Sequence, residues 1–156
     1  MIVAQLTDSH IKPNRRKAYG RVDTAEMLDA AVKHINAFEP PIDVVLISGD
    51  LTDRGEPEEF CALRQSLNNI SIPWYVIPGN HDDRQNFLEA FADHNYLEDS
   101  VSFIHYKIDG YPLQLIGLDT TVDGKSHGFL PPERLEWLDG CLASEPQKPT
   151  LVSVPT

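Results

Sequence analysis

The chain has 156 residues, with 13 Lys and Arg against 24 Asp and Glu, so its formal net charge at pH 7 is −11. Hydrophobic residues make up 41% of the chain, which is enough to bury a core and excludes a disordered acidic polymer. So acidic a surface repels nucleic-acid backbones and anionic membranes, and we expect neither as a partner. The acidity is compatible with a site where carboxylates bind divalent cations.

The two cysteines, Cys61 and Cys141, are far apart and belong to no Cys-rich motif. This usage favours a reducing compartment, and we expect a cytoplasmic protein. The apolar run at the N-terminus has no basic residues before it, so we expect no signal peptide. We also expect no transmembrane span, because no apolar stretch approaches eighteen residues.

Short runs rich in Val and Ile alternate with longer stretches of helical periodicity, which is typical of an α/β protein with one domain. Strands are expected, in chain order, at Ile2–Leu6, Asp43–Ser48, Pro73–Ile77, Val101–Ile108, Pro112–Leu118 and Thr150–Val154. The dipeptide Asp109-Gly110 between the fourth and fifth strands favours a hairpin turn. The sheet structure should therefore be mixed, with an antiparallel part near the C-terminal end.

Four helices are expected between these strands. The first begins at a capping pair, Asp23 and Glu26, and should be ended by Pro40 and Pro41. The others are expected at Pro57–Asn68, Asp83–Asp93 and Pro132–Ala143. In the last helix Leu135, Leu138 and Leu142 share one face, which we expect to pack against the protein.

Polar residues follow each of the first three predicted strands. Asp8 and His10 come after the first strand, Asp50 after the second, and Asn80 and His81 after the third. In open α/β sheets ligands bind beyond the carboxyl ends of the strands, so these side chains should gather at one edge. Carboxylate, imidazole and amide groups suit divalent ions such as zinc, manganese or iron(II).

Three short motifs resemble those of the calcineurin-like metallophosphoesterases. They are Asp8-x-His10, Gly49-Asp50-x-x-Asp53-Arg54-Gly55 and Gly79-Asn80-His81-Asp82. The Ile77–Asp83 run and the Gly128-Phe129-Leu130 segment look like the bacterial branch that hydrolyses cyclic nucleotides and glycerophosphodiesters. The resemblance implies an α/β fold, a mixed β-sheet sandwich flanked by helices, and a small phosphodiester substrate.

The resemblance also implies roles for individual residues around two divalent ions, which could be manganese, iron, zinc or cobalt. Asp8 and His10 would bind the first metal, Asp50 would bridge both, and Asn80 would bind the second. A metal-activated hydroxide would attack phosphorus. His81 would be no ligand but would face the substrate, stabilising the transition state or protonating the leaving alkoxide. Asp53 would hold the His81 ring by accepting a hydrogen bond.

Family members continue with a further histidine and a Gly-His-x-His motif, whereas this sequence has no histidine after His127 and stops at Thr156. We therefore expect residues 1–156 to be the N-terminal majority of such a domain, C-terminally incomplete. The second metal would keep only Asp50 and Asn80. The unclosed sheet would favour pairing with a second copy of the chain.

Two alternative functions follow from other features of the sequence. The missing histidines favour a catalytically impaired module that binds metal or a partner. A nucleotide-binding α/β domain without metal is disfavoured, because no GxGxxG or GxxxxGK[ST] motif follows any predicted strand.

Overall fold

The structure of the protein is a computed structural model, which defines residues 1–97 and 103–155. Over these residues the strands form two three-stranded sheets, in the orders β1-β2-β3 and β4-β5-β6. The strands are β1 (Val3–Thr7), β2 (Val44–Ser48), β3 (Trp74–Val76), β4 (Tyr106–Ile108), β5 (Gln114–Gly117) and β6 (Thr150–Ser153). The helices are α1 (Thr24–Asn36), α2 (Pro57–Leu67), α3 (Arg84–Ala90) and α4 (Pro132–Ser144), with short 3-10 turns η1 (Pro13–Arg15) and η2 (Asn95–Leu97).

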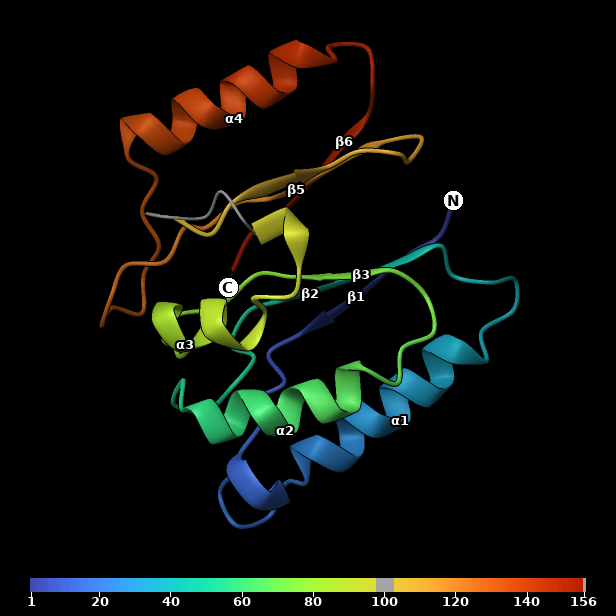
Figure 1. Ribbon diagram of the computed structural model, residues 1–156, viewed down its shortest axis with the longest axis vertical. Coiled ribbons are helices and arrows are strands. Elements are labelled where there is room, and N and C mark those ends of the chain that lie inside the picture. Colours follow the sequence, from blue (N-terminus) through green and yellow to red (C-terminus); the bar gives the residue numbers. More distant parts are fainter. Residues whose placement is uncertain (98–102, 156) are drawn as a thin grey trace.

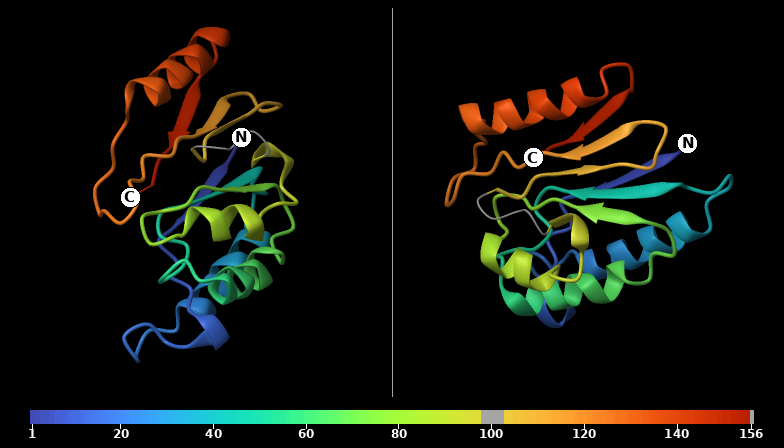
Figure 2. Two further views of the ribbon diagram at one scale, coloured as in Figure 1. Left: turned by 60° about the vertical axis from the view of Figure 1, so that its left-hand side comes forward. Right: turned by 45° about the horizontal axis from the view of Figure 1, so that its top comes forward.

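The two sheets face each other and are covered on their outer sides by helices (Figures 1 and 2). Helices α1 and α2 cover the first sheet, and α4 covers the second. This arrangement confirms the expected mixed sandwich flanked by helices. None of the helices in the described ranges is long and apolar enough to cross a membrane.

The first sheet is entirely parallel, and its register explains where the polar loops meet. Leu46 of β2 pairs with Gln5 of β1 on one side and with Tyr75 of β3 on the other. All five residues of β2 are buried, as expected of a central strand covered on both faces. Because the three strands run the same way, their carboxyl ends lie at one edge of the sheet.

The second sheet is mixed, as the sequence predicts. Strand β4 is antiparallel to β5 through the turn that contains Gly110 (φ 93°), whereas β6 is parallel to β5. The predicted strand Val101–Ile108 was too long, because only its last three residues form β4. Residues 101–102 lie outside the described ranges. The amide of Ile104 donates instead to the Asp119 carboxylate at 3.1 Å, so this segment leaves the strand ladder.

The predicted helices are confirmed, with two corrections. The Asp23 side chain accepts a hydrogen bond from the amide of Glu26 and so begins α1 as expected. The helix ends at Asn36, ahead of the proline pair that should have ended it. In α4, Leu135 and Leu142 are exposed, and the buried residue is Arg134. The face that packs on the protein is therefore defined by this arginine and not by the two outer leucines.

Candidate metal centre

The loops that follow β1, β2 and β3 meet at the carboxyl edge of the first sheet. Backbone pairing continues past the strand ends, since the amide of His10 donates to the carbonyl of Asp50 at 3.0 Å. Asp8 and His10 both adopt left-handed backbone conformations, with φ of 55° and 41°. Such values are uncommon for residues other than glycine and often mark functional sites. Here they turn the chain at the point where the first motif lies.

Three side chains from these loops converge. Single ligand atoms of His10, Asp50 and His81 all lie within 4.8 Å of one another. The Asp50 Oδ2 atom is 3.8 Å from His10 Nε2 and 3.7 Å from His81 Nε2. Both separations are longer than a hydrogen bond, so the three side chains lie close together without hydrogen bonds between these atoms. His10 and Asp50 offer an imidazole and a carboxylate, which are donors that fit zinc, manganese, iron or cobalt, and His81 lies beside them.

Asp50 is fixed at the centre of this cluster by its surroundings. It is 8% exposed, and its Oδ1 atom accepts the amide of His81 at 2.9 Å. The second oxygen therefore faces the two imidazoles. A β-carbon placed on Gly79 would lie 2.2 Å from Asp50 Oδ1, so the third loop can approach this carboxylate only because position 79 is glycine.

The other two predicted metal ligands lie near this cluster in different ways. Asp8 is not one of the three converging residues, and its Oδ1 atom accepts the amide of Asp50 at 3.4 Å. Its carboxylate lies against Gly49, where a β-carbon would be 2.8 Å away. Asn80 lines the hollow that also contains His81. These positions do not assign either residue to a metal.

His81 is held by Asp53 through a different atom from the one expected. The ring Nδ1 is 2.7 Å from the main-chain carbonyl of Asp53. The Asp53 carboxylate instead pairs with Lys12 and lies 3.7 Å from Arg54 Nε. The hydrogen bond from Lys12 lowers the pKa of Asp53. In this structure the main-chain carbonyl, and not the expected carboxylate, of Asp53 faces the ring, because that carboxylate is engaged by neighbouring cations.

Asp82 has a structural role that the sequence did not reveal. Its carboxylate accepts the amides of Leu51, Thr52 and Gly79 and the hydroxyl of Thr52, at 2.6 to 3.0 Å. It thereby ties the second motif loop to the third. Burial raises the pKa of Asp82 to about 6, against the effect of these donors. The only signal in the sequence is its place at the end of the third motif.

We expect Asp82→Asn to lower the free energy of unfolding by about 2–3 kcal/mol. An amide has a single acceptor oxygen, so its NH2 group would face two main-chain or hydroxyl donors. Chemical denaturation measures the change. Asp83→Asn is the matched control, because Asp83 caps α3 by accepting the amide of Asn86 and asparagine caps helices equally well. Equal stability of the two variants would contradict the assigned role of Asp82.

Another buried carboxylate connects the third loop to the second sheet. Asp119 is fully buried just beyond β5 and accepts Arg84 Nη2 at 3.0 Å. Arg134 from α4 donates to the carbonyl of Asp119 at 2.6 Å and stacks 3.8 Å from the Phe103 ring. Arg84 begins α3, three residues after His81. No motif pointed to this group, although Asp119 does follow a predicted strand.

The chain matches a protein-family model over nearly its whole length. The model described as calcineurin-like phosphoesterase matches residues 1–153. The chain belongs to the calcineurin-like phosphoesterase family. This agrees with the two-sheet sandwich and with the convergence of His10, Asp50 and His81 at the edge of the first sheet.

The names of individual relatives within the calcineurin-like family describe two activities. A protein of Arcobacter nitrofigilis named "Probable glycerophosphodiester phosphodiesterase" is 38% identical, covering 99% of this chain and 56% of its own length. The glycerophosphodiester phosphodiesterase of Enterobacter lignolyticus is 32% identical. The match covers 97% of this chain and 55% of the length of that relative. The 3′,5′-cyclic adenosine monophosphate phosphodiesterase of Escherichia coli K12 is 28% identical. The match covers 96% of this chain and 53% of the length of that relative. This calcineurin-like chain thus spans just over half the length of these relatives.

Proposed function

We propose that this chain binds divalent metal and hydrolyses a small phosphodiester of the glycerophosphodiester or cyclic nucleotide type. The observation that supports the proposal most is the convergence of His10, Asp50 and His81 on one another within 4.8 Å. His10 and Asp50 would hold the metal, with Asp8 and Asn80 as further ligands. Manganese, iron, zinc and cobalt all suit these side chains.

A divalent ion bound here would act as a Lewis acid, activating water and polarising the phosphoryl oxygens. The residues of the chain would position the substrate and handle the proton. A carbonyl oxygen only accepts, so the contact with Asp53 places a proton on His81 Nδ1. When the ring is doubly protonated, its Nε2–H can donate to the leaving alkoxide. Asp50 Oδ2 lies 3.7 Å from that Nε2 atom.

His81→Ala tests this role of His81. We expect hydrolysis of glycerophosphoglycerol, whose leaving group is a basic alkoxide, to fall by about 100-fold, because proton transfer to that leaving group is lost. Metal content, measured by elemental analysis, should stay close to that of the unmodified protein. His34→Ala, an exposed change on α1, is the control. Loss of metal from His81→Ala would show instead that His81 is a ligand.

A second candidate function is a module that binds metal without turnover. Among histidine, cysteine and carboxylate side chains of the described ranges, one group of three converges. That favours a single ion. Elemental analysis after purification with added manganese or zinc separates the candidates. Two equivalents of metal together with phosphodiester hydrolysis support the enzyme, whereas about one equivalent without hydrolysis supports the module.

We also propose a cytoplasmic location, since Cys61 and Cys141 are both free thiols, as a reducing compartment would leave them. Self-association is a further proposal. It is supported by two exposed apolar residues, Val152 within β6 and Val154 just beyond it.

A further inference from the structure

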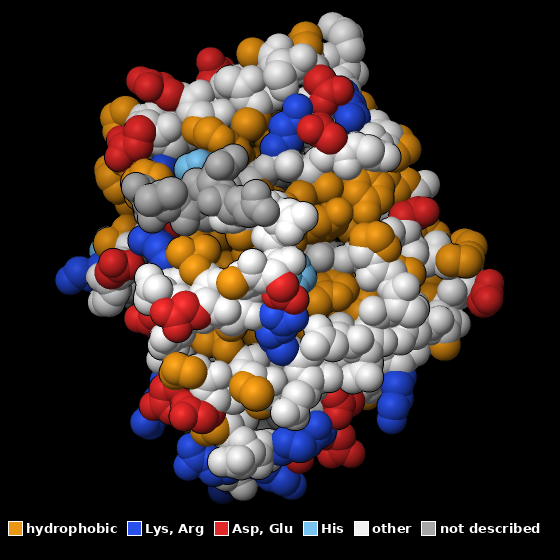
Figure 3. Space-filling model, viewed as in Figure 1, with side chains coloured by type: hydrophobic (Ala, Val, Ile, Leu, Met, Phe, Trp, Pro, Cys, Tyr) orange, Lys and Arg blue, Asp and Glu red, His pale blue; other side chains and the backbone are white. Residues whose placement is uncertain are grey.

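One segment of this acidic protein is strongly basic. Residues 12–21 contain five of the 13 Lys and Arg residues and no Asp or Glu, in a chain whose net charge is −11. The segment follows β1 and includes η1, at the lower end of the molecule in Figure 1. Figure 3 shows Lys and Arg side chains gathered over this end. So uneven a distribution of charge favours anionic ligands at one place on the surface.

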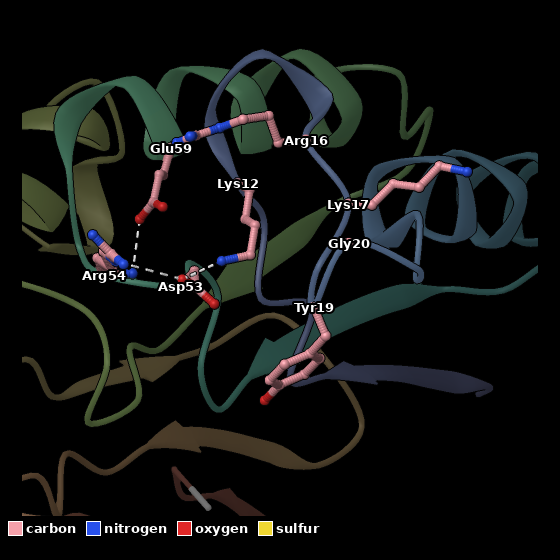
Figure 4. Close-up of a pocket in the computed structure, with 8 residues that line it drawn as sticks. All are labelled: Lys12, Arg16, Lys17, Tyr19, Gly20, Asp53, Arg54 and Glu59. Atoms are coloured by element: carbon pink, nitrogen blue, oxygen red, sulfur yellow. Dashed lines mark hydrogen bonds and ion pairs between the residues drawn. The ribbon is translucent and has the colours of Figure 1, made fainter.

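The basic segment is anchored and encloses a pocket. Pro13 and Ala18 are buried, and Ala18 exchanges backbone hydrogen bonds with Val22 at 2.8 and 3.0 Å. The basic segment, the loop after β2 and the start of α2 together line a cavity of about 290 Å³ (Figure 4). The residues that line it are Lys12, Arg16, Lys17, Tyr19, Gly20, Asp53, Arg54 and Glu59. In Figure 4 the Lys17 side chain extends away from Asp53, so the other cations are the ones that a ligand in the pocket would meet.

This basic pocket adjoins the candidate metal centre. Asp53 lines the pocket, and its carbonyl is the group 2.7 Å from His81 Nδ1. Arg54 lines both the basic pocket and a neighbouring cavity of about 520 Å³ that contains Asn80 and His81. A ligand whose phosphodiester lies at the metal centre could therefore extend past Arg54 into the basic pocket.

The negative groups in the basic pocket are already engaged, and two of its cations are available. Asp53 pairs with Lys12, and the Glu59 carboxylate accepts the main-chain amide of Arg54 at 2.8 Å. The Arg54 side chain is 73% exposed, and its contact with Asp53 is 3.7 Å long. Within the described residues no ion pair engages the Arg16 guanidinium. Guanidinium groups bind phosphate and carboxylate through paired hydrogen bonds.

We infer that the basic pocket binds a second anionic group of the substrate, a phosphate or carboxylate, through Arg16 and Arg54. The inference rests on the proposed function for the position of the scissile phosphodiester. The preferred substrates are then phosphodiesters that bear a further negative charge on one arm. Neutral or cationic arms would leave Arg54 with only its 3.7 Å contact to Asp53 and would offer Arg16 no anion.

Binding to the metal-free protein tests the pocket independently of catalysis. The chain, treated with a chelator, is titrated calorimetrically with glycerol 3-phosphate and, as the uncharged comparison, with glycerol. Saturable binding of glycerol 3-phosphate alone is expected. Arg16→Gln and Arg54→Gln should each weaken this binding by about fivefold, the effect of losing one charge-assisted contact at a partly exposed site. Arg21→Gln, on the same segment but outside the pocket, should change it less than twofold.

A second measurement addresses substrate choice. Metal-loaded protein is given glycerophosphoglycerol or its derivative with a terminal phosphate, and kcat/KM is compared by phosphorus NMR. The unmodified protein should prefer the phosphorylated compound, and Arg16→Gln should lower that preference by about fivefold. Hydrolysis of neither compound, nor of a cyclic nucleotide, would refute the proposed function, while the calorimetric result still decides the pocket. Equal binding of glycerol 3-phosphate by all variants, or none by the unmodified protein, would refute the pocket even if both compounds are hydrolysed.

Discussion

Replacing Asp50 by alanine is expected to abolish metal-dependent phosphodiester hydrolysis and to weaken metal binding by more than about 100-fold. Loss of a group that merely orients a metal ligand costs up to about 100-fold in metal affinity, and a direct ligand contributes more. Asp50 also lies close to both imidazoles, at 3.8 and 3.7 Å. Removing it would leave His10 and His81 without a shared anion. Calorimetric titration with manganese and turnover of bis(p-nitrophenyl) phosphate measure the two effects.

The companion variant Asp50→Asn separates charge from structure. An asparagine oxygen can still accept the amide of His81, which the native Oδ1 accepts at 2.9 Å, so the third loop should keep its position. Metal affinity and turnover should nevertheless fall nearly as far as in Asp50→Ala, because the negative charge is gone. Asp139→Asn, an exposed change of the same kind on α4, should leave both properties intact. If Asp50→Ala binds metal as tightly as the unmodified protein does, Asp50 is not a ligand of the metal centre.

Gly79→Ala is expected to cost about 3 kcal/mol of unfolding free energy and to displace the Asp50 carboxylate. The added methyl group would lie 2.2 Å from Asp50 Oδ1 and 2.5 Å from the amide nitrogen of Asp50. A main-chain atom cannot move aside as a flexible side chain can, so the second and third loops would have to separate. Chemical denaturation gives the loss of stability, and manganese titration gives the accompanying loss of affinity.

Gly140→Ala provides the opposite result with the same chemical change. Gly140 lies inside α4, and a β-carbon there meets no other atom within 4 Å. Alanine at this position should raise stability by about 0.5–1 kcal/mol, because glycine is the poorer helix former. A small effect of Gly79→Ala, close to that of Gly140→Ala, would mean that the two loops are not packed as closely as described.

The sequence is most informative where local chemistry and topology agree. The apolar run of β2 and the polar residues just beyond three predicted strands are enough to predict that Asp50 and His81 lie at one edge of the sheet. Parallel pairing then brings those strand ends together by geometry alone. The cap at Asp23 is equally predictable, because helix starts are encoded within four residues.

Contacts between distant residues are not predictable in this way. The pairing of Asp53 with Lys12 joins positions 41 residues apart, and it decides that a carbonyl and not a carboxylate faces His81. Likewise, α4 packs through Arg134 because its guanidinium contacts Asp119 and Phe103. Helical periodicity in the sequence does not predict these contacts. In both cases the identity of the partner, and not local propensity, determines the outcome.

The buried Asp119 carboxylate connects the packing of the two sheets to the position of the His81 loop. It accepts from Arg84, which begins α3, and from the amide of Ile104, just ahead of β4. Any motion that pries the two sheets apart must therefore break this anchor or pull on the segment that carries His81. The two sheets and the loop that carries His81 should therefore move together. A change in the separation of the sheets would displace the His81 imidazole.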